Sequence, residues 1–237
     1  MVVVPAGDFK MGSLDNEAGR DSDEGPQHAV TIAQPFAVGR FEVTFAEWDA
    51  CVAAGACKHK PETDWGRGNQ PVMRVSWNDV STEYLPWLSK NTGKTYRLLT
   101  EAEWEYSARA KTTGPFSFDG KITTDKANHD GNYSYDGSPK GEYRAKTVPV
   151  KTFDPNPWGL YQVHGNVWEW VQDCKTDYKE TPRDGSVAQS TEGCARVLRG
   201  GSWSSSPQDL RAAYRDDIAP GNRGNGLGFR VARTLTP

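Results

Sequence analysis

The chain has 237 residues and a formal net charge of −3, and its 36% hydrophobic content includes nine Trp, nine Tyr and eight Phe residues. This length supports one domain with its own core, which we expect to span residues 1–237, and the 24 Gly and 15 Pro residues predict much loop. The Lys and Arg residues are scattered and no apolar run reaches the length of a membrane span, so we expect neither nucleic-acid binding nor direct membrane insertion.

Short apolar runs separated by polar turns occupy the first forty residues. The runs at 2–4, 9–11, 28–32 and 36–38 have the length and spacing of short antiparallel strands. The acidic stretch 15–24 lies between two of these runs, and its composition predicts a solvated loop.

Two helices are expected in the next fifty residues. The pattern at 44–54 places a candidate N-cap, Thr44, before an apolar stripe that ends at a glycine. A second helix should run from its cap at Ser76 to about Lys90. Pro86 lies inside it and lacks an amide hydrogen, so we expect a kink or a break in the hydrogen-bond ladder there.

A short strand then leads into a third helix at 100–110. Thr100 and Glu103 have the spacing of a capping box, which marks the start of this helix. From Lys111 onward no further helix is predicted, and the sequence is typical of turns, aromatic residues and short strands.

The four cysteines fall into two pairs that are local in the sequence, Cys51 with Cys57 and Cys174 with Cys194. Neither pair has the Cys-x-x-Cys spacing of a zinc site, so disulfides are the favoured prediction and four buried free thiols are the alternative. Disulfides would place the protein outside the reducing cytosol, in the periplasm or at a surface.

Several segments carry a resemblance to a known family. They are Pro5-Ala6-Gly7, Gly165-Asn166-Val167-Trp168-Glu169-Trp170, Arg199-Gly200-Gly201-Ser202-Trp203 and Gly228-Phe229-Arg230. In order and spacing the chain resembles the formylglycine-generating enzyme (sulfatase-modifying factor) domains. The resemblance implies an α+β, C-type-lectin-like fold with small antiparallel sheets, a few helices and much ordered loop. The matched region starts at the first predicted strand, and the sequence leaves open whether a signal, anchor or fused domain precedes it.

Five arginines are spaced through the predicted loops of the last forty residues. They are Arg199, Arg211, Arg215, Arg223 and Arg230. We expect them to tie backbone carbonyls and carboxylates together, because a loop-rich fold needs such links, and a catalytic arginine cluster is the alternative. The Gly200-Gly201 pair predicts backbone angles or a close approach that a side chain would forbid.

The resemblance also bears on catalysis. Enzymatic members of the family oxidise a sulfatase cysteine with a copper-binding pair of cysteines, and alignment puts that pair at Ser205 and Leu210 here. Serine and leucine cannot supply thiolate ligands, so we expect no copper, no residual oxidase activity of that type and no assigned catalytic residue. Ser205 has no neighbouring base in the sequence that would make it a nucleophile.

The C-terminal pattern is also similar to the variable region of ligand-binding proteins that retroelements diversify. The predicted binding surface comprises Trp203, Ser204, Ser205, Ser206, Asp209, Tyr214, Asp216, Asp217, Gly221, Gly224 and Gly226. Small polar residues and tyrosine make an adaptable contact surface. The leading hypothesis is a non-catalytic domain that binds an unknown protein or small ligand. The alternatives are an oxidoreductase of the formylglycine-generating or siderophore-maturation type with a non-cysteine metal site, and an inert family member with solvated loops.

The resemblance implies structural calcium as a cofactor. Asn156 matches a position where family members bind calcium through a side-chain oxygen and nearby carbonyls, such as that of Gly159. A second site would involve Asn128, the backbone oxygen of His129 and Glu142. The alternative is that these are ordinary turn residues, since Asn favours turns.

Overall fold

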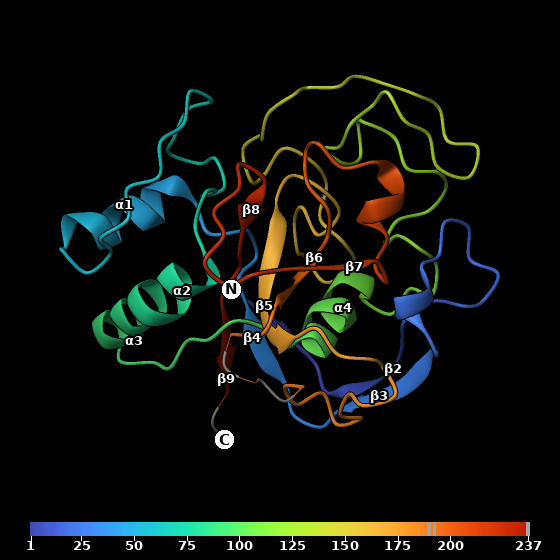
Figure 1. Ribbon diagram of the computed structural model, residues 1–237, viewed down its shortest axis with the longest axis horizontal. Helices are drawn as coiled ribbons and strands as arrows, with labels where there is room; N and C mark the ends of the chain where they lie inside the picture. The colour runs from blue at the N-terminus through green and yellow to red at the C-terminus, as the bar shows by residue number, and fades with distance from the viewer. Residues whose placement is uncertain (189–190, 192, 236–237) are drawn as a thin grey trace.

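The computed structural model describes residues 1–188, 191 and 193–235, and it combines three small sheets with short helices and long loops (Figure 1). The strands are β1 (Val2–Val4), β2 (Gly7–Met11), β3 (His28–Ile32), β4 (Phe36–Val38), β5 (Trp168–Cys174), β6 (Arg196–Arg199), β7 (Arg215–Ile218), β8 (Leu227–Gly228) and β9 (Ala232–Thr234). The α-helices are α1 (Phe45–Ala53), α2 (Trp77–Asp79), α3 (Leu85–Thr92) and α4 (Glu101–Arg109). This arrangement is α+β, as the sequence predicts.

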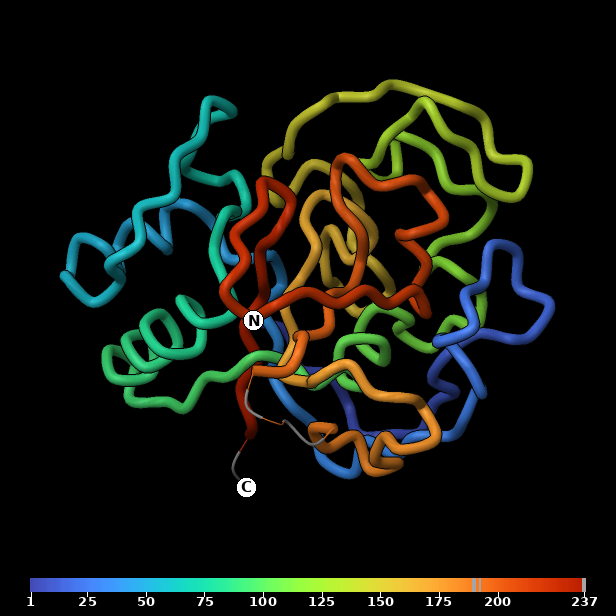
Figure 2. The backbone as a smooth tube through the Cα atoms, viewed as in Figure 1, coloured from blue at the N-terminus to red at the C-terminus, as the bar shows by residue number. Residues whose placement is uncertain are grey.

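The sheets join distant parts of the chain. β4 pairs antiparallel with both β1 and β9, so the first and last strands share one sheet, and β2 pairs with β3. The third sheet has the order β7-β6-β5-β8, in which only the β5–β8 pair is parallel. Figure 2 shows the loops between α4 and β5, in green and yellow, passing over one side of this sheet. None of the helices in the described part of the chain is long and apolar enough to cross a membrane.

The three predicted helix starts are confirmed. Thr44, Ser76 and Thr100 each take the N-cap position of α1, α2 and α4, and each side chain accepts the backbone N–H three residues on. The acidic side chain three residues later returns the bond to the cap's own backbone N–H in all three cases. Local side-chain chemistry therefore fixes where these helices begin.

The single helix predicted from Ser76 to Lys90 is instead three consecutive segments. Between α2 and α3 the residues Val80–Tyr84 form a π-helix, in which the Leu85 N–H donates to the carbonyl of Val80. Pro86 explains the change, because it has no N–H to give and its ring would collide with the carbonyl four residues earlier in a regular helix. The wider turn relieves that conflict, which is the break in the ladder that the sequence predicts.

The prediction that the acidic stretch 15–24 is a solvated loop is wrong at its end. Glu24 is completely buried, and its two oxygens accept from Arg211 Nη1 at 2.7 Å and Arg211 Nη2 at 2.5 Å. The same guanidinium also bonds Glu17 at 2.8 Å. A charged group can be buried only if it is paired, and the partner here is 187 residues away in the sequence.

Helix α4 lies at the centre of the molecule, and all of its residues are buried even though four of them are charged. Glu101 accepts two bonds from Arg215, at 2.8 and 2.6 Å. Glu105 accepts from Arg109 at 2.8 Å and from Arg199 at 2.5 Å. The prediction that the C-terminal arginines tie loops to carboxylates is thus confirmed.

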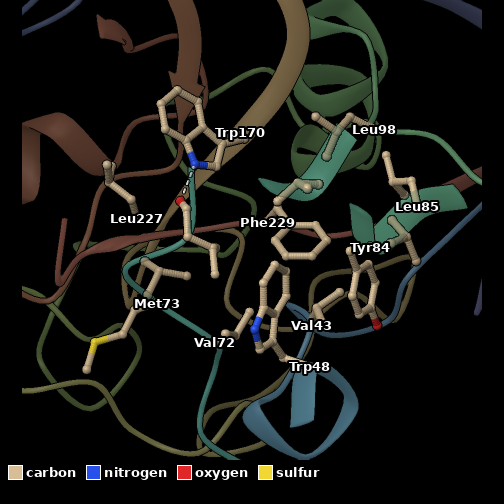
Figure 3. Close-up of a cluster of buried hydrophobic side chains, with 14 of the residues drawn as sticks. Val43, Trp48, Val72, Met73, Tyr84, Leu85, Leu98, Trp170, Leu227 and Phe229 are labelled. Atoms are coloured by element: carbon tan, nitrogen blue, oxygen red, sulfur yellow. Dashed lines mark hydrogen bonds between the residues drawn. The ribbon is translucent and has the colours of Figure 1, made fainter. Parts of the chain in front are cut away.

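One of the apolar clusters packs the helices on the left of Figure 1 against the C-terminal segment. In the close-up of Figure 3, Trp48 stacks on Tyr84 with ring centroids 5.4 Å apart, and Phe229 lies edge-on to both. Trp170 donates its Nε1–H to the Val75 carbonyl at 2.9 Å. Aromatic rings supply large buried area, and a buried indole N–H needs such a partner.

Both predicted disulfides are present. Cys51 and Cys57 close the C-terminal end of α1, with Cα atoms 5.3 Å apart. Cys174 and Cys194 close the loop between β5 and β6, with Cα atoms 5.8 Å apart. Disulfides of this kind are typical of proteins that work in an oxidising compartment.

The buried pairing of Arg211 gives a stability prediction. Arg211→Met should lower the free energy of unfolding by about 3–5 kcal/mol, because it leaves the Glu24 carboxylate buried without its partner. The control is Arg223→Met, because the Arg223 side chain is 45% exposed in its pair with Asp79 and should contribute no more than about 1 kcal/mol. Urea unfolding of both variants measures the two losses, and equal losses would contradict the prediction.

Candidate functional site

The eleven residues of the predicted binding surface fall into three short segments, 203–209, 214–217 and 221–226. Four of them are exposed, namely Ser204, Asp216, Asp217 and Gly221, whereas Trp203, Ser205 and Gly226 are buried and the other four are partly buried. Asp209 accepts a bond from the backbone N–H of Ser206 at 3.2 Å, which caps the short 3₁₀ turn at 207–210. The segment therefore mixes residues open to a ligand with residues that hold its own backbone.

A tight turn presents the first of these segments. Gly200 and Gly201 have φ angles of 95° and 74°, and a Cβ atom on Gly201 would lie 2.6 Å from a methyl carbon of Leu210. Both observations require glycine, as the sequence predicts. The turn directs Trp203 toward two loops from other parts of the chain.

Three aromatic rings meet at that point, and we call Trp65, Tyr143 and Trp203 the aromatic cluster. Trp65 lies edge-on to Trp203 with centroids 5.0 Å apart, and Tyr143 stacks on Trp203 at 6.0 Å. Trp203 donates its Nε1–H to the Asn225 carbonyl at 3.1 Å, and Tyr143 is 36% exposed. Only Trp203 was predicted, because nothing in the sequence indicates that residues 65 and 143 lie beside it.

Asn166 connects the aromatic cluster to the interior. Its carbonyl accepts from the Trp203 N–H at 2.9 Å, and its own N–H donates to the Asn128 carbonyl at 2.9 Å. Its side-chain Nδ2 donates to Glu42 Oε1 at 3.0 Å. The φ angle of Asn166 is 70°, a conformation that Asn tolerates better than most residues. Asn166 therefore holds both the backbone of Trp203 and the buried carboxyl group of Glu42.

Glu42 is 1% exposed, and its second oxygen, Oε2, has no hydrogen-bond partner in the described part of the chain. The nearby Arg230 is committed to Glu169 through bonds of 2.7 and 2.5 Å, so it does not form an ion pair with Glu42. Burial, followed by the charge of Glu169, raises the pKa of Glu42 well above its usual value. The Glu42 carboxyl group therefore keeps its proton to a higher pH than an exposed glutamate does.

Glu42 also lines a pocket of about 780 Å³, a size that suits a small organic molecule. Other lining residues include Arg40, Asn69 and Lys151. Neither Arg40 nor Lys151 forms a salt bridge within the described residues. A buried carboxyl group beside basic side chains that form no salt bridge in the described residues was not predicted from the sequence. The sequence feature that could have indicated it is the position of Glu42, a single charged residue between the apolar residues Phe41 and Val43.

A family profile described as "Sulfatase-modifying factor enzyme 1-like domain" matches residues 1–235. The chain belongs to this family. A Streptomyces coelicolor protein named formylglycine-generating enzyme is 32% identical over 98% of this chain and 88% of its own length. PvdO from Pseudomonas aeruginosa has a solved structure that is 43% identical with a TM-score of 0.87, covering 98% of this chain and 93% of that one. Treponema denticola variable protein 1 is 26% identical with a TM-score of 0.75, covering 98% and 94%.

The family's cysteine positions hold packed, non-ligating side chains here. The Ser205 hydroxyl accepts from the Ser202 N–H at 3.1 Å, and Leu210 is completely buried. His164, which contacts this loop, donates from Nδ1 to the Leu210 carbonyl at 2.7 Å and accepts the Ser117 N–H at Nε2. Burial lowers the pKa of His164 to about 4, so it is neutral and already fully bonded. No base in the described residues activates Ser205.

The Asn156 side chain, as it lies here, offers no oxygen to calcium. Its Oδ1 accepts the N–H groups of Trp158 and Leu160, and its Nδ2 donates to the carbonyls of Ser107 and Ala108. All of its bonding capacity is used to hold a turn in which the Gly159 N–H donates to the Asn156 carbonyl. Calcium at this position stays a prediction. The contacts seen here do not fit a calcium ligand, because the side-chain oxygen of Asn156 already accepts two N–H groups.

At the second predicted calcium site, the side-chain oxygen of Asn128 is not used in a hydrogen bond with any described residue. Asn128 Oδ1 is buried without a hydrogen-bond partner among the described residues, as are both ring nitrogens of His129. Glu142, however, is mostly exposed and pairs with Arg144 at 3.3 Å. Across the described residues, no three His, Cys, Asp or Glu side chains are grouped to hold a metal ion. Calcium at this site also stays a prediction.

The raised pKa of Glu42 predicts a pH dependence of stability. The folded protein keeps a proton that the unfolded chain releases above the ordinary glutamate pKa of 4.5, so the unfolding free energy falls as the pH rises from there toward the folded pKa. The unfolding free energy of the wild type minus that of Glu42→Gln should therefore decrease as the pH rises above the ordinary glutamate pKa of 4.5 in urea titrations. A flat difference would show that Glu42 ionises normally, and Glu62→Gln at an exposed position is the control.

Proposed function

We propose that the protein is an enzyme that binds a small organic molecule in the Glu42 pocket, with Glu42 as its general acid. The observation that carries this proposal is a buried carboxyl group whose Oε2 is unpartnered among the described residues and which lines a pocket of ligand size. Buried polar atoms without a partner are rare, and ionisable groups with strongly shifted pKa values concentrate at functional sites.

The arrangement around Glu42 suits proton donation. Asn166 holds one carboxyl oxygen, which fixes the orientation of the group, and the other oxygen has no hydrogen-bond partner among the described residues. A neutral carboxyl group can give its proton to a nitrogen or oxygen atom of a bound molecule, and the carboxylate so formed can take a proton back. Arg40 and Lys151 favour a ligand that carries negative charge.

This proposal favours the enzymatic alternative over a purely binding role. The family resemblance includes oxidative members of siderophore maturation that depart from the cysteine pattern, so loss of the cysteine pair does not by itself exclude an oxidative reaction. Ser205 and Leu210 supply no thiolate, so such a reaction would not use thiolate-bound copper at these positions. Siderophore precursors are the first substrates to test.

The test compares the wild type with Glu42→Gln, which keeps the shape of the side chain and an oxygen for Asn166 but has no acidic proton. We expect substrate-dependent oxygen consumption or a change in the substrate's absorbance with the wild type, and a loss of about 10²–10⁴-fold in kcat with the variant. Glu62→Gln should keep full activity because Glu62 is exposed and does not line the pocket. Turnover that survives in Glu42→Gln would contradict the proposed role.

A second candidate function is recognition of a larger partner through the aromatic cluster and the exposed residues beside it. The half-open stack of Tyr143 on Trp203, with the exposed Ser204 next in the chain, supports it, because Tyr and Trp give contact area at low entropic cost. The similarity to Treponema denticola variable protein 1 supports the same reading.

Two variants locate such a surface. If the aromatic cluster binds, Tyr143→Ala should abolish retention of the protein on a glycan or peptide array while Asp216→Ala, on the exposed edge strand β7, leaves it unchanged. If the strand binds, the pattern is reversed. Melting temperatures should match the wild type in both variants, and retention that neither variant reduces would reject this surface.

A further inference from the structure

A second pocket lies between the α2–α3 segment and the β5–β6 hairpin, on residues that the Glu42 pocket does not share. Its volume is about 410 Å³. Its walls are largely apolar and include Trp77, Leu85, Tyr96 and Leu98. It borders the π-helix, since Ser81 lies within that segment and Leu85 follows it directly. π-helical turns are rare and occur frequently at functional sites.

Arg196, the first residue of β6, supplies the charge in this pocket. Its guanidinium stacks on the Trp77 ring at 3.8 Å, and the indole is held in turn by a bond from its Nε1–H to the Val171 carbonyl at 2.9 Å. Nη1 of Arg196 donates to the Gln172 carbonyl at 2.5 Å. The stacking on Trp77 and the hydrogen bond from Nη1 together fix the position of the guanidinium.

The opposite edge of the same guanidinium is not engaged. Nε of Arg196 is buried without a hydrogen-bond partner, and no described carboxylate forms a salt bridge with this residue. Burial lowers the pKa of Arg196, which is the signature of a cation that lacks a close counter-ion. The other arginine of the pocket, Arg97, is neutralised by two bonds to Glu103 at 2.6 and 2.7 Å.

We propose that this pocket binds a small planar aromatic carboxylate, whose carboxylate group pairs with the Nε and Nη2 edge of Arg196 and whose ring lies against the apolar wall. The Nε and Nη2 hydrogens of a guanidinium point the same way and match the two oxygens of a carboxylate. The ring replaces water on Trp77, Tyr96 and Leu98. An uncharged amide can accept from only one of the two N–H groups and carries no opposite charge, so the pocket selects for the anion.

The probe is 2-naphthoate, and 2-naphthamide is its uncharged match. Isothermal titration of the intact protein should detect 2-naphthoate and show at least about tenfold weaker binding of the amide, since loss of a charge-assisted bidentate contact is worth a factor of this size or more. Arg196→Gln should weaken 2-naphthoate by a similar factor. Arg233→Gln, on β9 outside the pocket, should bind like the wild type.

A second variant guards against a folding defect in Arg196→Gln. Ser81→Phe keeps Arg196 and places a large side chain in the pocket, so it should remove 2-naphthoate binding. The melting curve should be retained, because the Ser81 hydroxyl bonds only the Asn78 carbonyl. Glu42→Gln should leave the affinity for 2-naphthoate unchanged, which separates this pocket from the proposed enzymatic site. Equal affinity for the acid and the amide, unchanged affinity in Arg196→Gln or Ser81→Phe, or no binding of 2-naphthoate would each overturn the proposal.

Discussion

The pairing of buried arginines with buried glutamates is the constraint on which the rest of this structure depends. The side chains of Arg199, Arg211, Arg215 and Arg230 are at most 1% exposed, and each one contacts a glutamate that is at most 2% exposed. A fold with short sheets and long loops has few hydrogen bonds between strands to hold its loops in place. The arginine–glutamate contacts therefore fix the positions of the loops. Their cost is the desolvation of eight charged groups, which only near-ideal geometry can offset.

The same constraint produces the unusual state of Glu42. Arg230 lies close enough to influence Glu42, but its Nε and Nη2 donate to Glu169 and its Nη1 donates to the Gly39 carbonyl. The result is a buried carboxyl group with one amide donor and no ion-pair partner among the described residues, and burial raises its pKa well above the usual value. Asn166 then connects Glu42 to the Trp203 loop. Hydrogen bonds thus run from the Glu42 carboxyl group in the pocket wall, through Asn166, to the backbone of Trp203 in the aromatic cluster.

The family scaffold therefore supports more than one place for a ligand. Leu210 now fills the turn where the resemblance puts a copper ligand, and it packs against Gly201. Buried polar atoms that have no partner among the described residues lie elsewhere, and they include atoms of Glu42, Asn128 and Arg196. Each marks a position where the protein's own groups do not complete the hydrogen bonding, in contrast to the saturated side chains of Asn156 and His164. Membership of the family fixes the fold, whereas these atoms distinguish the chemistry of the sites.

The sequence by itself determined the local features of the protein. Threonine and serine caps marked the helix starts, Pro86 marked the broken ladder, Gly200 and Gly201 marked the turn, and the cysteine spacing marked the two disulfides. All of these depend on interactions within a few residues or on short closed loops. Tertiary structure alone decided which glutamate each arginine meets, that Glu24 is buried, and that Glu42 is left without a cation. These outcomes depend on contacts across 60 to 190 residues, where the free energy of a charge is set by partners and burial that no local pattern encodes.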